Sequence, residues 1–105
     1  MSPGYYVLPA EVADSAVPEN GILSRTLFED DHQRIMVFAF DAGQQLSEHT
    51  ASVPATIQIL RGEATVTLGG DAFQASPGNL FYMQPELKHS VVATSPMVML
   101  LTMGR

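Results

Sequence analysis

Apolar and polar residues alternate in short runs along most of this chain. In the run of residues 63–68, Ala64, Val66 and Leu68 share one face, and the residues between them are polar. An alternation of period two is typical of a β-strand with one buried face. A helical period does not persist over any long stretch, so the sequence predicts an all-β fold.

Turn signals divide the chain into about eight or nine short strands, at the spacing typical of a β-sandwich or barrel. Gly69 and Gly70 form a two-residue hairpin signal, and Ser76, Pro77 and Gly78 form another turn. The strands that the pattern predicts are residues 22–28, 35–40, 55–60, 63–68, 72–75, 80–84, 89–93 and 97–103.

Two segments depart from simple alternation. Residues 35–40 are apolar on both faces, so this strand needs the core on one side and another layer or subunit on the other.

The first 20 residues are interrupted by Pro3, Pro9 and Pro18, and Pro9 suits the start of one or two helical turns. We therefore predict one domain over residues 1–105, with an arm (1–20) lying over the surface or over a partner, and a β-barrel (21–105).

Composition narrows the function classes. Hydrophobic residues make up 46% of the chain, as expected for a packed domain, and the formal charge is −6. That charge disfavours nucleic acid and anionic membrane surfaces as partners. The chain has no cysteine, no apolar run near membrane length and no recognisable leader, so we expect a cytoplasmic protein without disulfides or thiolate metal sites.

Two stretches carry a family resemblance. The first begins at Gly43, continues to His49 after five residues, and ends at Gly62. The second, SPGNLFYMQPELKHSV, has Gly78 before a strand and His89 shortly after a proline. Together they resemble the two motifs of the cupin superfamily, which implies a double-stranded β-helix, that is, a jelly-roll barrel.

The resemblance also implies a metal held by three histidines and a glutamate inside the barrel. Of these positions only His49 and His89 carry over, because Ala51 replaces the second histidine and Ala55 replaces the glutamate. Two imidazoles do not usually hold a divalent ion tightly. We therefore expect no required cofactor, and the alternative is a weak, exchangeable Zn, Ni or Fe ion on His49 and His89.

Three functions remain open. The first is a non-enzymatic barrel that binds a small molecule, in a pocket that we expect to be lined by His49, His89, Ala51, Ala55, Ile57, Ile59 and Met83. The second is a metal-dependent enzyme of dioxygenase or isomerase type, and the third is an interaction module with a collapsed barrel. The resemblance implies a homodimer under all three, and sedimentation would distinguish it from a monomer of 11.3 kDa.

Overall fold

The computed structural model describes residues 3–105 and confirms the all-β prediction. A 3-10 helix, η1, follows Pro9 as expected, and in residues 3–105 no helix has the length and apolar character needed to cross a membrane. The elements are η1 (Ala10–Asp14), β1 (Ile22–Glu29), β2 (Gln33–Phe40), β3 (Gln45–His49), β4 (Ala55–Arg61), β5 (Ala64–Leu68), β6 (Asp71–Ala75), β7 (Leu80–Met83), β8 (His89–Ala93) and β9 (Met97–Gly104).

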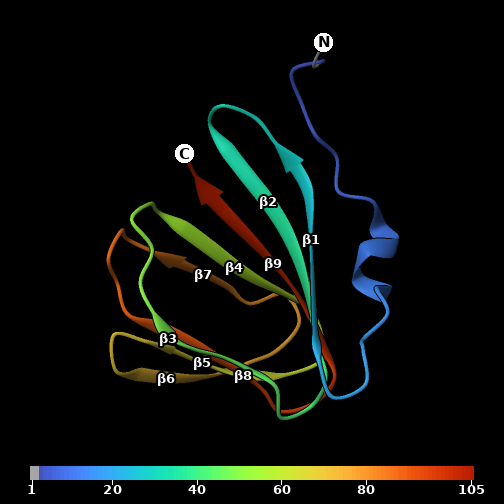
Figure 1. The fold of residues 1–105 in the computed structure, drawn as a ribbon, viewed down its shortest axis with the longest axis vertical. Coiled ribbons are helices and arrows are strands. Elements are labelled where there is room, and N and C mark those ends of the chain that lie inside the picture. The colour runs from blue at the N-terminus through green and yellow to red at the C-terminus, as the bar shows by residue number, and fades with distance from the viewer. Residues whose placement is uncertain (1–2) are drawn as a thin grey trace.

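The strands form two antiparallel sheets that lie over one another (Figure 1). The larger sheet has five strands in the order β1-β2-β9-β4-β7, and the smaller has four in the order β3-β8-β5-β6. Strands that are far apart in sequence are neighbours, as when β9 pairs with both β2 and β4. This arrangement confirms the jelly-roll barrel that the motifs predicted.

The inner faces of the two sheets enclose the main core. Alternate residues of β4 are buried, as the period-two pattern predicted, while Thr56 and Gln58 lie on the outer face. The large side chains on the inner faces are fully buried, which requires them to fill the space between the sheets. They include Phe40, Ile57, Ile59, Val66, Met83, Val91, Met97 and Met99.

The outer face of the larger sheet is covered by the arm of the same chain (Figure 1). Val12 of η1 is 5% exposed and belongs to a second apolar cluster with Val37 and Ala39 of β2 and Val98 of β9. The two-sided apolar strand of residues 35–40 is thus covered from within the chain. Its burial does not require a second subunit, and the homodimer stays a prediction.

The three motif glycines adopt backbone conformations that favour glycine. Gly43, Gly62 and Gly78 have φ angles of 84°, 79° and 94°, a region in which other residues are strained. At Gly62 a Cβ atom would lie 2.1 Å from the carbonyl oxygen of Pro96 and 2.7 Å from Cα of Met97. Gly62 therefore lets the β4–β5 turn pack directly against the start of β9.

Candidate functional site

The two motif histidines lie opposite each other at the ends of neighbouring strands. His49 is the last residue of β3 and His89 the first of β8, and the two are partners in the antiparallel ladder. Their pairing depends on a β-bulge, because Leu46 pairs with Val91 and one extra residue lies between Leu46 and His49 on β3. In a regular strand, side chains at Leu46 and His49 would point to opposite faces. The bulge restores the shared face and directs His49 to the same side as His89.

The imidazole rings are close and similarly anchored. Their centroids lie 4.2 Å apart and the ring planes are inclined by 56°. Nδ1 of His49 lies 2.8 Å from the Ser47 carbonyl oxygen, and Nδ1 of His89 lies 3.0 Å from that of Leu87. A carbonyl oxygen only accepts, so each Nδ1 carries the hydrogen. In the neutral tautomer this leaves a lone pair on each Nε2, and within residues 3–105 neither Nε2 has a hydrogen-bond partner.

The pair lies at the mouth of the barrel and not deep inside it. His49 is exposed, whereas His89 is buried, with 6% of its surface exposed. Leu68 of β5 is the ladder partner of His89 on its other side. A ligand entering from solvent would therefore meet His49 first and His89 beneath it.

The alanines at the positions of the other two family ligands carry only methyl groups, which cannot bind a metal. Ala51 lies in the loop after β3, where its carbonyl accepts a hydrogen bond from the Glu86 amide, and Ala55 is buried at the start of β4. Ile57, Ile59 and Met83 are fully buried in the inner core. Their contact with a ligand stays a prediction.

The side chains present do not fit the metal set of the family. Among residues 3–105, no group of three or more His, Cys, Asp or Glu side chains could hold one ion. Glu48 and Glu86, the carboxylates nearest in sequence to the two histidines, are both exposed. His32, the third histidine, lies in the exposed β1–β2 turn, as predicted. The pair therefore offers two ligands where the family's set supplies four.

Sequence reasoning missed the apolar rim of this mouth. Leu46, Leu68 and Leu87 are partly buried and pack against the inner core, on or next to the elements that carry the two histidines. Strand parity placed Leu68 on the apolar face of residues 63–68 but not beside the histidines, and Leu46 is a single apolar residue in a polar stretch where the bulge breaks the parity. Leu87 lies in a loop, where alternation gives no signal.

Comparison with known proteins agrees with this architecture. The family profile described as "Cupin domain" matches residues 36–103. A conserved protein of unknown function from Streptococcus pyogenes has a similar structure, with a TM-score of 0.82, 27% identity, and coverage of 95% of this chain and 87% of that one. A cupin superfamily protein from Desulfitobacterium hafniense has a TM-score of 0.84 and 24% identity, covering 97% of this chain and 93% of that one.

A third structure, a cupin 2 conserved barrel domain protein from Leptotrichia buccalis, has a TM-score of 0.82 and 26% identity. This chain is covered to 92% in that alignment and the Leptotrichia chain to 46%. No curated protein matches the chain. The profile match extends over more than half of the 105 residues and includes both histidine-bearing strands, so the chain belongs to the cupin family.

Proposed function

We propose that this cupin binds a small organic molecule at the mouth of its barrel through His49 and His89. The observation that supports this most strongly is the shared anchoring of the rings, each with Nδ1 on the carbonyl two residues before it. This anchoring holds the rings in place before a ligand arrives, which lowers the entropic cost of binding.

The chemistry of the pair favours a hydroxylated ligand. Two neighbouring Nε2 lone pairs accept hydrogen bonds, so they suit a molecule with two adjacent donors, such as neighbouring hydroxyl groups. The partly buried Leu46, Leu68 and Leu87 add apolar contact beside these acceptors. A few polar groups set among apolar side chains are typical of small-molecule sites.

A metal-dependent enzyme of dioxygenase or isomerase type is the alternative function. One observation favours it, since a backbone carbonyl that binds Nδ1 is also the usual outer partner of a metal-ligating histidine. The ligand count opposes it, because no third His, Cys, Asp or Glu joins the pair in the described chain. We therefore rank metal-independent binding first.

A titration of tag-free, chelator-treated protein with cis-1,2-cyclohexanediol distinguishes metal-independent ligand binding from the metal-dependent alternative. We expect ring ¹⁵N signals of His49 and His89 to shift while that of His32 does not. His49→Ala should weaken binding by about fivefold, because one net hydrogen bond contributes about 1 kcal/mol. His32→Ala, a change in an exposed turn, is the matched control.

Unchanged binding by His49→Ala, or no shift at either ring, would contradict the proposal. The metal alternative predicts a different pattern. Binding or turnover would then appear only after reloading with Zn, Ni or Fe, with one ion per chain retained by the parent and by His32→Ala, and lost in His49→Ala.

A further inference from the structure

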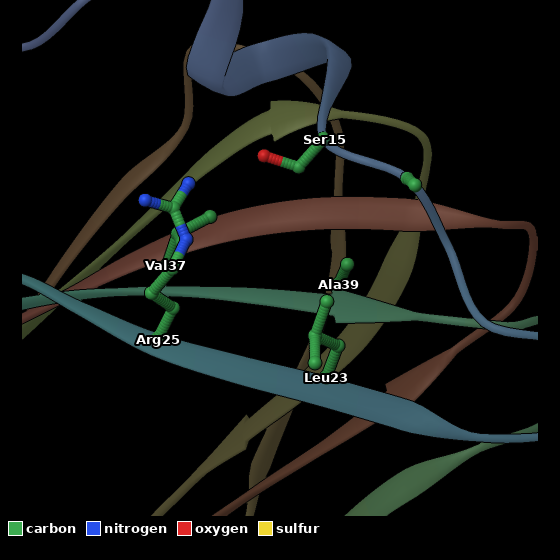
Figure 2. Close-up of a pocket in the computed structure, with 6 residues that line it drawn as sticks. Ser15, Leu23, Arg25, Val37 and Ala39 are labelled. Atoms are coloured by element: carbon green, nitrogen blue, oxygen red, sulfur yellow. The ribbon is translucent and has the colours of Figure 1, made fainter.

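A hollow lies on the outer face of the larger sheet, between the arm and strands β1 and β2 (Figure 2). It has a volume of about 140 Å³. Its lining is mostly apolar with one cation, and consists of Ser15, Ala16, Leu23, Arg25, Val37 and Ala39. This hollow is separate from the histidine pair and does not rest on the function proposed above.

The floor of the hollow follows from the register of the β1–β2 ladder. Leu23 pairs with Ala39, and Arg25 pairs with Val37, so these four side chains form two adjacent rows on the outer face. Val37 and Ala39 are buried in the second apolar cluster. The small side chain of Ala39 beside Leu23 leaves the space that a larger residue would fill.

The roof is held in place by hydrogen bonds. Arg61 donates from Nη2 to the Ser15 carbonyl at 3.1 Å, and its Nη1 lies 3.8 Å from an Asp14 carboxylate oxygen. The Ser15 hydroxyl donates to the Val12 carbonyl at 2.6 Å, so its hydrogen is already in use. These contacts fix the distance between the arm and the strands β1 and β2. The hollow is therefore formed before any ligand binds.

Arg25 is the unusual member of this lining. The other three arginines each contact a carboxylate: Arg34 and Arg105 contact Glu29, and Arg61 contacts Asp14. Within residues 3–105, Arg25 has no ion pair and no side-chain hydrogen bond. Figure 2 shows its guanidinium group rising from β1 toward the arm, on the side where Ser15 lies.

An unpaired guanidinium group at the edge of an apolar hollow suits one class of ligand. Guanidinium binds carboxylates in a bidentate manner, and a cavity of roughly 150 Å³ holds a molecule the size of benzene. In a chain of net charge −6, an anion has few other cations to approach. We propose that this hollow binds a small organic acid, with its carboxylate on Arg25 and a compact apolar body of about six carbons over Leu23, Val37 and Ala39.

Benzoate is the probe for this site, and benzamide is its uncharged analogue of the same shape. We expect benzoate to shift the methyl signals of Leu23 and Val37 in ¹³C–¹H spectra, with an affinity on the order of 1 mM because Arg25 is exposed. Benzamide should bind up to about fivefold more weakly, because it lacks the charge and the second acceptor oxygen that pair with the guanidinium in a bidentate manner, and the exposure of Arg25 limits that gain.

Arg25→Gln should lose most of the affinity for benzoate and bind benzoate and benzamide alike. Arg25→Lys should retain part of the affinity, because it keeps the charge without the planar fork. Lys88→Gln is the matched control, since it removes one exposed cation from the loop before β8 and should leave benzoate binding unchanged. Arg25 is exposed and unpaired, so its substitution should not alter the fold.

Three results would overturn the proposal: no shift with millimolar benzoate, equal binding of benzamide and benzoate by the parent, or unchanged benzoate affinity in Arg25→Gln. A loss of benzoate binding in His49→Ala with no loss in Arg25→Gln would place the acid at the barrel mouth instead. The outcome of the diol titration does not affect any of these results.

Discussion

The two faces of the larger sheet are buried in different ways. The inner face packs against the whole second sheet, and residues such as Phe40, Ile59 and Met99 have no exposed surface. The outer face is covered by one arm with a short helix, in which Val12 is buried in the sheet cluster while Leu8 and Val17 pack against that cluster and stay partly exposed. The second sheet therefore buries the whole inner face, whereas the arm buries only part of the outer face and leaves a hollow at the edge of that part.

The largest expected effect comes from breaking the inner face. Phe40→Ala should lower the free energy of unfolding by about 3–5 kcal/mol, because it empties a fully buried position in the core. That loss is a large part of the roughly 5–15 kcal/mol that a domain of this size has. Urea unfolding followed by circular dichroism measures it.

Phe73→Ala is the matched control for that change, because Phe73 of β6 is 44% exposed and contacts Phe81 at the edge of the two sheets. Phe73→Ala should lower the free energy of unfolding by clearly less than Phe40→Ala does. Equal losses from the two substitutions would show that the inner face is not more tightly packed than its edge.

A smaller effect should follow from weakening the outer cover. Val12→Ala removes two buried methyl groups and should lower the free energy of unfolding by about 1–2 kcal/mol. We expect faster amide hydrogen exchange in η1 than in β2 and β9, since the arm can open without the barrel.

The control here is Val7→Ala, at a position that is 72% exposed, which should change neither stability nor exchange. If Val12→Ala instead accelerates exchange equally in the arm and in the barrel strands, then the arm unfolds together with the barrel and the contrast between the two faces disappears.

The smallest expected effect lies in the β1–β2 turn, outside both layers. The amides of His32 and Gln33 each donate to one Asp30 carboxylate oxygen at 2.8 Å. The bonds from His32 and then Gln33 lower the pKa of Asp30 below its ordinary value of 3.8. Since the folded state binds this proton less readily than the unfolded state, the stabilisation is present above the unfolded pKa and lost as pH falls through the folded one.

Asp30→Asn should therefore make stability fall less steeply below about pH 4 and leave its pH dependence near neutrality unchanged. Urea unfolding at a series of acidic pH values measures this slope. Asp31→Asn, next to it in the same exposed turn, is the control. A steeper acid loss in Asp30→Asn than in the parent would be the wrong sign for a lowered pKa.

Much of this fold could be predicted because strand alternation is a local property. The sequence predicted eight of the strands and the helical turn after Pro9, and the structure confirms them with small changes at the ends. It also predicted that residues 35–40 need cover on both sides. It could not say what supplies the outer cover, because the arm and a second subunit would present the same apolar surface.

The site was predicted less completely. Motif spacing identified His49 and His89, yet neither Ser47 nor Glu48 signals the bulge that brings the rings to one face. The exposure of His49 also depends on where β3 ends, which alternation does not determine. Arg25 carried no signal, since the absence of an ion pair depends on where the folded chain places its carboxylates, which the sequence pattern does not show.

The bulge in β3 affects how this chain should be compared with homologues that have the same two histidines. One additional residue between Leu46 and His49 decides which face of β3 carries the ring. The presence of both histidines therefore does not define the site unless the number of residues between Leu46 and His49 is also the same. A homologue that kept both histidines but lacked that residue would carry one of them on the outside of its barrel. Alignments that close such single-residue gaps would thus assign a paired site to a protein that has none.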